Sequence, residues 1–394
     1  MNWKSAWSYL PVDWNTNIGT VCNITQRTFF KNNLDGTKIK IKFSNLFSKQ
    51  SLTLENVTIG KRDKTQTDIR EIRKVTFQKS EKIVVEAGAE FYSDEIDLSV
   101  CFKEDLVLSI YIKESTDIYS VCSTWAARSW NTRYGLDGNY VNEQTFTETD
   151  SFDVYTALQY DPNRADNIFG VTEIKVYTGN DVKTVAMFGD SITHMSYYSD
   201  ALLEKLYECY PGKITVINRG LGGNRLLRDY SHVLDVPGGG TIFGHAGVER
   251  FYHDVYGSDQ PETVLVLIGI NDFTHPYALK HEDEAVTMDE YQKGITEIIR
   301  IAHENGSKIM IGTLTPFRYG ETEWFTPSEK LRTEANKWIR EQKFSDGIMD
   351  FDLATRITEK PEYMFEDCHL GDGLHPNVLG GKKMTDVVPV EWFK

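Results

Sequence analysis

The chain has 394 residues, more than a single hydrophobic core usually supports, so its length predicts two domains. An apolar fraction of 40% and a charged fraction of 26% are ordinary for a soluble globular protein. The formal charge of −15 and the isoelectric point near 5.1 argue against partners that require a basic surface. We therefore expect no nucleic acid and no anionic membrane as a partner.

The sequence contains no targeting or metal-binding pattern. The N-terminal stretch, residues 1–14, has one lysine and no continuous apolar core, so it does not predict a signal peptide. We therefore expect a cytoplasmic protein, or a secreted one if a leader has been removed. The cysteines form no CxxC pair and the histidines no HExxH spacing, so we expect no metal and no cofactor. The five cysteines are Cys22, Cys101, Cys122, Cys209 and Cys368.

Residues 1–180 alternate apolar and polar side chains with period two, as half-buried strands do. Turn residues at 32–36 (NNLDG) and at Gly88 separate these segments. No helical pattern lies between them, so this part predicts an antiparallel β-sandwich of jelly-roll type as a first domain. The clearest strand segments are TKIKIKFSNLF (37–47), SLTLENVTIG (51–60), KIVVEAGAEF (82–91) and DLVLSIYIKES (105–115).

The period changes near residues 176–183, and residues 181–394 then alternate short apolar runs with helical patterns. Helical spacing is clear near 197–209, 286–304 and 328–343. This alternation predicts an α/β domain with a parallel sheet covered on both faces. The predicted strands are TVAMF (184–188), KITVI (213–217), TVLVLI (263–268), KIMIGTL (308–314) and GIMDF (347–351).

Loops that follow the predicted strands contain the reactive residue types, where open α/β folds place their active sites. GDSIT supplies Ser191, NRGLGGNRLL (218–227) supplies Gly223, GIND supplies Asn271, and DGLHP supplies Asp372 and His375. A serine nucleophile needs a base, an acid that orients the base, and donors for the oxyanion. His375 can be the base and Asp372 its partner three residues earlier. The amides of Ser191 and Gly223 and the side chain of Asn271 can be the donors.

Each of these residues also has a purely structural interpretation. Ser191 can be a helix N-cap, the glycines at 220–223 a turn, and Asn271 and Asp372 turn caps. His375, before a proline, can be a surface histidine. Because all the features follow strands in an order that completes one site, we favour the catalytic interpretation.

In this order, the blocks GDS (189–191), Gly223, GIND (269–272) and DGLH (372–375) resemble those of the SGNH (GDSL-type) hydrolase superfamily. The resemblance covers residues 181–394 and implies a flavodoxin-like three-layer fold and ester hydrolysis. It makes Ser191 the nucleophile and an oxyanion donor, with Gly223 and Asn271 as further donors. Asp372 and His375 complete the triad. The first block reads GDSIT where the family name has GDSL.

The first half resembles, less specifically, the β-sandwich that precedes this hydrolase domain in some bacterial members, several of them carbohydrate esterases. The stretches that carry this resemblance are SNLFSKQSLTLENVTIG (44–60) and GAEFYSDEIDLSV (88–100). It favours removal of acetyl groups from a sugar. The sandwich can be a sugar-binding module or only a packing platform. Trp125 and Trp130 can stack on sugar rings if they are exposed, although large aromatics more commonly lie in the core.

A long segment from Leu226 to Ser258 can form a wall of the active-site cleft. No long apolar lid follows any of the four blocks, so the sequence favours a short acyl group over a long one. The expected substrate is a small-molecule or oligosaccharide ester. A lysophospholipase or thioesterase is the main enzymatic alternative, and a carbohydrate-binding protein with a degenerate hydrolase domain is the non-enzymatic one. The sequence does not indicate the oligomeric state.

Overall fold

The computed structural model describes residues 1–64, 68–126, 128–148, 166–234 and 236–394. Contacts between Cα atoms divide the chain into two compact units. The first consists of residues 1–182 and 206–217, and the second of residues 183–205 and 218–394. In the described ranges, none of the helices combines the length and the apolar character that crossing a membrane requires.

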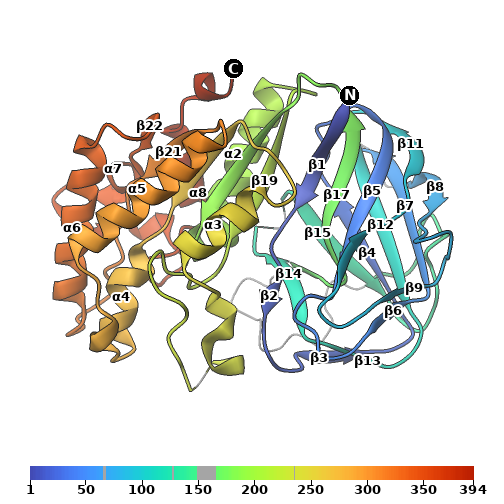
Figure 1. The fold of residues 1–394 in the computed structure, drawn as a ribbon, viewed down its shortest axis with the longest axis horizontal. Helices are drawn as coiled ribbons and strands as arrows, with labels where there is room; N and C mark the ends of the chain where they lie inside the picture. Colours follow the sequence, from blue (N-terminus) through green and yellow to red (C-terminus); the bar gives the residue numbers. More distant parts are fainter. Residues whose placement is uncertain (65–67, 127, 149–165, 235) are drawn as a thin grey trace. The chain divides into compact units, whose positions relative to one another are not determined.

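Two five-stranded antiparallel sheets form most of the first unit, which confirms the β-rich first half (Figure 1). One sheet has the order β1-β17-β5-β10, with β11 also paired to β5. Its strands are β1 (Asn2–Ser8), β17 (Val171–Thr178), β5 (Gly36–Ser44), β10 (Glu90–Tyr92) and β11 (Ile96–Val100). The other has the order β15-β4-β12-β7-β8. Its strands are β15 (Trp130–Gly135), β4 (Ile24–Phe30), β12 (Glu104–Ile112), β7 (Asn56–Asp63) and β8 (Arg70–Lys74).

Three smaller sheets complete this unit, with the orders β13-β3, β16-β14-β2 and β6-β9. Their strands are β2 (Val12–Asp13), β3 (Gly19–Val21), β6 (Leu52–Leu54), β9 (Ile83–Val85), β13 (Thr116–Ile118), β14 (Ser120–Thr124) and β16 (Asp166–Ile168).

One predicted strand, DLVLSIYIKES, differs from expectation because β12 is buried on both faces. The alternation predicted one solvated face, but the polar side chains of this sheet hydrogen-bond within the protein. Ser109 accepts from Nε of Arg27 at 2.8 Å, and the same guanidinium donates to the carbonyls of Tyr140 and Glu143 at 2.9 Å each. The segment that includes residues 140–143 thus supplies the partners that water would otherwise supply.

Trp130 does not meet the condition of exposure that stacking on a sugar requires, because the residue is 1% exposed and lies in the core. It contacts the rings of Trp7 and Tyr9 edge-on, with centroids 5.6 and 5.4 Å apart. Trp125, by contrast, is half-buried.

The second unit contains most of the predicted parallel sheet, whose order is β19-β18-β20-β21-β22; the first residues of β19 are assigned to the first unit. The pairings β18–β20, β20–β21 and β21–β22 are parallel. All five residues of β20 are buried, as expected for a strand covered on both faces. The strands are β18 (Lys183–Gly189), β19 (Ile214–Gly220), β20 (Thr263–Leu267), β21 (Lys308–Gly312) and β22 (Gly347–Met349), and a separate pair is formed by β23 (Arg356–Ile357) and β24 (Lys360–Met364).

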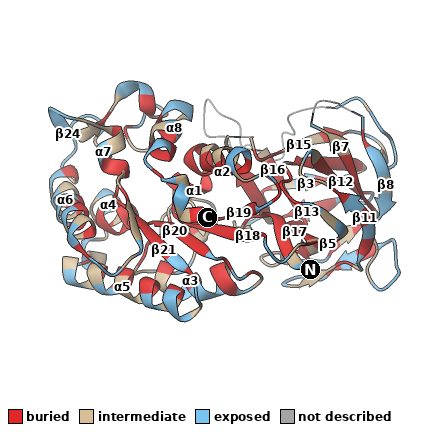
Figure 2. Cartoon of the chain, turned by 90° about the horizontal axis from the view of Figure 1, so that it is seen from above, coloured by how far each residue is buried: buried red, intermediate tan, exposed pale blue. Residues whose placement is uncertain are grey.

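Helices lie on both sides of this sheet, with α2 and α8 on one side and α3 and α5 on the other (Figure 2). The three layers confirm the predicted SGNH-type α/β fold. The helices are α1 (Ser191–His194), α2 (Tyr197–Cys209), α3 (Gly247–Tyr256), α4 (Ile270–Ala278), α5 (Met288–Glu304), α6 (Phe325–Glu341), α7 (Phe351–Thr355) and α8 (Val378–Asp386). Short 3₁₀ helices are η2 (Pro237–Phe243), η3 (Glu282–Glu284), η4 (Glu366–Cys368) and η5 (Val390–Phe393).

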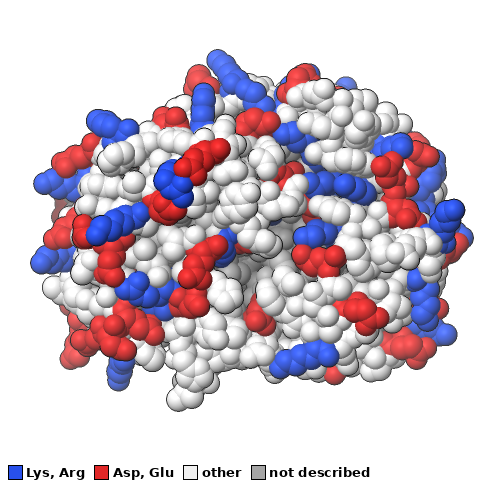
Figure 3. All heavy atoms as spheres, in the orientation of Figure 1, with Lys and Arg blue, Asp and Glu red and all other residues white. Residues whose placement is uncertain are grey.

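Local sequence explains where α5 begins and how its outer face is solvated. Thr287 and Glu290 form a capping box, in which each side chain accepts from the other residue's backbone amide. Further along, Arg300 pairs with Glu297 at 2.6 Å and with Glu304 one turn later. Figure 3 shows acidic and basic side chains interspersed in this way over the face that it presents.

Candidate active site

Three side chains from two distant parts of the chain meet in one hydrogen-bonded row. Ser191 lies two residues after the end of β18 and is the first residue of α1. Nε2 of His375 lies 2.8 Å from Oγ of Ser191, and Nδ1 of His375 lies 2.5 Å from Oδ2 of Asp372. The side chain of His375 is 16% exposed, so the row is open to solvent only in part.

Asp372 shapes the turn that carries His375, in addition to contacting its ring. Its Oδ1 accepts from the backbone amides of Leu374 and His375, at 3.0 and 2.9 Å. Burial pushes the pKa of the Asp372 carboxyl upward, but the bonds from His375 and the amides outweigh burial and bring it to about 2. The carboxylate is therefore charged at neutral pH. The turn and the catalytic interpretations of this residue are compatible.

The helix N-cap next to the serine is Asp190, not Ser191. The Oδ1 of Asp190 accepts from the amide of Ile192 at 3.0 Å, which leaves the Ser191 hydroxyl available to His375. Asp190 is fully buried, and burial raises the pKa of its carboxyl to about 7. Its Oδ2 has no hydrogen-bond partner among the described residues. The N-cap interpretation of Ser191 is therefore wrong.

The predicted donors follow the two strands that flank β18 in the sheet, Gly223 after β19 and Asn271 after β20. Gly223 has φ +70°, a conformation that favours glycine. No acceptor for its amide is found among the described residues. Asn271 lies in the first turn of α4, is 5% exposed, and donates from Nδ2 to the carbonyl of Asn224 at 2.9 Å. An amide nitrogen has two hydrogens, so a second donation remains available.

A buried histidine that the sequence analysis did not single out supports the loop of Gly223. Nδ1 of His194 accepts from the amide of Gly222 at 3.0 Å. Burial, reinforced by the nearby Arg250, lowers the pKa of His194 to about 4, so the ring is neutral and can accept this bond. His194 lies in the GDSITH segment, three residues after Ser191. This spacing places both residues on one helical turn, and it was the signal in the sequence that could have identified His194 as a residue near the site.

Arg250 is a second residue that sequence reasoning missed, and it connects the loops of the site. From α3, its buried guanidinium donates to the carbonyls of Gly189 (2.8 Å) and Arg219 (3.1 Å) and to Oδ1 of Asn224 (2.9 Å). It also pairs with Asp254 at 2.8 Å. Gly189 precedes the loop of Ser191, and Asn224 follows Gly223, so the side chain of Arg250 contacts both of these segments.

Part of the segment expected to wall the cleft, Leu226–Ser258, is helical, because α3 lies within it. It is anchored near Asn271 by the next residue, Asp272. The carboxylate of Asp272 accepts from the amides of Leu226 and Leu227 at 2.6 and 2.9 Å. Burial raises the pKa of Asp272 to about 6.

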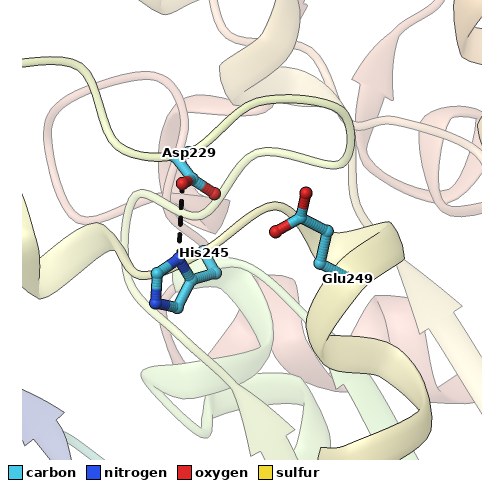
Figure 4. A group of neighbouring side chains, drawn as sticks. All are labelled: Asp229, His245 and Glu249. Atoms are coloured by element: carbon cyan, nitrogen blue, oxygen red, sulfur yellow. Dashed lines mark hydrogen bonds and ion pairs between the residues drawn. The ribbon is translucent and has the colours of Figure 1, made fainter.

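One group of described side chains, Asp229, His245 and Glu249, has donor atoms close enough to share a metal ion, all within 4.8 Å (Figure 4). All three residues are exposed. The carboxylate of Asp229 already accepts from the amide of Ala246 at 2.8 Å and lies 3.3 Å from Nδ1 of His245. These bonds connect Asp229 to His245 and to the start of α3, and none of the three residues belongs to the row of Ser191, His375 and Asp372.

Comparison with known proteins assigns the part of the chain that contains the parallel sheet to a family. Residues 187–383, half of the chain, match the model of the GDSL-like Lipase/Acylhydrolase family. Among curated proteins, none matches the sequence.

Two solved structures resemble the chain over about half its length. LAE5, an alpha/beta hydrolase enzyme from the metagenome of Lake Arreo, is 19% identical, with a TM-score of 0.39 over 52% of this chain and 92% of its own. A mutant of Axe2, an acetylxylan esterase from Geobacillus stearothermophilus, is 21% identical, with a TM-score of 0.40 over 52% and 91%. Similarity at this level carries no statement about the substrate.

Proposed function

Since the chain belongs to the GDSL-like lipase/acylhydrolase family and is a hydrolase of the esterase type, we propose that it removes short acyl groups, acetyl above all, from a carbohydrate ester. The observation that carries this proposal is the row Ser191–His375–Asp372, with distances of 2.8 and 2.5 Å. A serine, a histidine and a carboxylate in this row are the groups that acyl transfer through an acyl-enzyme requires.

In the proposed reaction, Oγ of Ser191 attacks the ester carbonyl while Nε2 of His375 takes the hydroxyl proton. The charged Asp372 holds the imidazole by Nδ1 and stabilises the imidazolium. The amides of Ser191 and Gly223 and Nδ2 of Asn271 donate to the oxygen that becomes negative. The C–O bond to the alcohol then breaks, and His375 gives its proton to the leaving oxygen.

The second half of the reaction repeats these steps with water. His375 takes a proton from the water that attacks the acyl-enzyme, and returns it to Ser191 as the carboxylic acid leaves. All these steps use side chains and amides of this chain. The proposal therefore assigns no role to a metal or cofactor.

A short acyl group on a neutral alcohol is favoured by the charge and by the sequence around the blocks. A net charge of −15 repels anionic lipid headgroups, whereas a neutral sugar ester meets no such repulsion. The sequence next to the four blocks contains no long apolar segment that could cover a long acyl chain.

The test is hydrolysis of p-nitrophenyl acetate, followed by release of acetate from a panel of acetylated polysaccharides. We expect turnover of the small ester by the wild type and none by Ser191→Ala with an unchanged circular dichroism spectrum. More than a few per cent of wild-type turnover in that variant would contradict the role of Ser191. A maximal rate on acyl chains of eight carbons or more would instead indicate a lipid acyl hydrolase.

A further inference from the structure

An aromatic ring packs against the backbone of one proposed oxyanion donor. A Cβ atom added at Gly223 would lie 2.5 Å from Cε1 of Phe243 and closer still to Cδ1. The ring therefore lies directly against the Cα of Gly223. We therefore expect a group bound at the amide of Gly223 to lie near this ring.

The position of Phe243 is set by the residue that follows Gly223. Nδ2 of Asn224 donates to the carbonyl of Phe243 at 2.7 Å and to that of His245 at 2.8 Å. The ring and the donor amide thus belong to segments that one side chain holds together. Phe243 is half-buried, so part of its ring is open to a ligand.

His275 extends this aromatic surface towards the second donor. It lies on α4 one turn after Asn271, and its ring centroid is 5.4 Å from that of Phe243. Burial, reinforced by Arg225, lowers the pKa of His275 to about 4, so the ring is uncharged at neutral pH. His275 is also half-buried. The two rings form an uncharged surface beside Gly223 and Asn271, which we call the aromatic wall.

The chemistry of the proposed reaction indicates which part of the ester meets the aromatic wall. His375 must protonate the leaving alcohol, so the alcohol lies beside the turn at 372–375. Leu374 of that turn packs against a different cluster, formed by Ile270, Phe317 and Phe325. The acyl chain is bonded to the carbonyl carbon on the side away from the alcohol. We therefore expect the acyl chain to lie against the aromatic wall.

We propose that Phe243 and His275 line the acyl side of the site and limit the length of the acyl chain that it accepts. This inference rests on the proposed esterase function. The Asn224 side chain holds the backbone of Phe243, and the rings of Phe243 and His275 pack together, so we expect each added methylene of the acyl chain to meet this surface.

The test compares kcat/KM for p-nitrophenyl acetate, butyrate and hexanoate. In Phe243→Ala the butyrate-to-acetate ratio should rise by about tenfold or more, since one methylene in an apolar pocket changes specificity by roughly 10–200-fold. His275→Ala should raise the ratio less, in the same direction. Tyr252→Ala, an aromatic truncation at a 56% exposed position of α3, is the matched control and should leave the ratio unchanged.

Phe243→Leu and His275→Ala decide the question if Phe243→Ala does not fold. A wild-type ratio in folded, active Phe243 variants would overturn the proposal. So would loss of all activity in both Phe243 variants with normal circular dichroism, because the ring would then be needed to position Gly223. Inactivity of the wild type on every ester would contradict the proposed function itself. The wild-type assay alone shows this, so failure of the proposed function can be distinguished from failure of the inference about Phe243 and His275.

Discussion

Asp372 binds His375 twice, once at the ring and once at the backbone. Oδ2 lies 2.5 Å from Nδ1, and Oδ1 accepts from the His375 amide at 2.9 Å. The same carboxylate therefore sets both the orientation of the imidazole and the fold of the turn that carries it. These two contributions can be separated by substitution.

Asp372→Asn should keep the turn and lose the charge, since an amide oxygen can still accept from the backbone. We expect kcat to fall by about 10⁴, as when the imidazole takes the wrong tautomer. Asp372→Ala should be equally inactive but should also melt at a lower temperature. Assays with p-nitrophenyl acetate and thermal melts of both variants test this, and a near-wild-type rate in Asp372→Asn would exclude Asp372 as the orienting acid.

Asn271→Ala should lower kcat by roughly 10²–10³ with little change in KM, because an oxyanion donor acts mainly in the transition state. Steady-state kinetics on p-nitrophenyl acetate give both constants. A large rise in KM with kcat retained would instead make Asn271 a substrate-binding residue.

Stability should depend on pH through Asp190, whose pKa burial raises to about 7 from a usual value near 4. Between these values the folded state binds more protons than the unfolded state. The contribution of Asp190 therefore lowers the protein's free energy of unfolding as pH rises from about 4 to about 7. The loss approaches about 1.4 kcal/mol per pH unit. Asp190→Asn retains an N-cap and lacks the titration.

The measurement for Asp190 is the difference in melting temperature between Asp190→Asn and the wild type at several pH values. The melting temperature of Asp190→Asn should rise relative to that of the wild type as pH rises from about 4 to about 7. A difference that is constant from pH 4 to 8 would contradict the raised pKa.

Arg250→Met should destabilise the protein by about 3–5 kcal/mol, because it leaves the carboxylate of Asp254, whose side chain is only 11% exposed, without its guanidinium. Urea denaturation measures the change. Arg300→Met is the matched control, since Arg300 makes only exposed ion pairs on α5, and its effect should be below about 1 kcal/mol. If the two variants lose the same free energy of unfolding, burial of Arg250 is not the cause of the destabilisation.

Activity should not change in EDTA, since the proposed steps involve no metal. The exposed group of Asp229, His245 and Glu249 gives a specific control, because His245→Ala should also be insensitive to chelation. Activity that disappears in EDTA and returns with a divalent ion would show that another mechanism operates.

Much of the fold could be predicted because period and propensity act locally. The predicted strand TVAMF lies within β18, and the helical pattern at 197–209 coincides with α2. α4 escaped detection because Pro276 lies inside it, where proline removes a backbone donor. The burial of β12 on both faces depends on Arg27, which is 82 residues from Ser109 in the chain and binds carbonyls 113 and 116 residues from itself, and no local pattern contains these contacts.

The candidate site divides in the same way. The chemical residue types and their places after strands were visible in the sequence, and the structure brings Ser191, His375 and Asp372 together. Their supports were not visible. His194 matters because its ring meets the amide of Gly222, and Arg250 because α3 brings it to Gly189, and both contacts arise only when the sheet and its helices assemble.

Ser191 and His375 are 184 residues apart in the chain, although their side chains touch. During synthesis the serine is made long before its base, so a nascent or truncated chain that ends before residue 375 carries a hydroxyl with no proton acceptor. A protease cut followed by loss of the later piece has the same result. Hydrolysis by this protein would therefore require that both residues are present and that folding has brought them together, and a chain that ends before residue 375 would not release acyl groups.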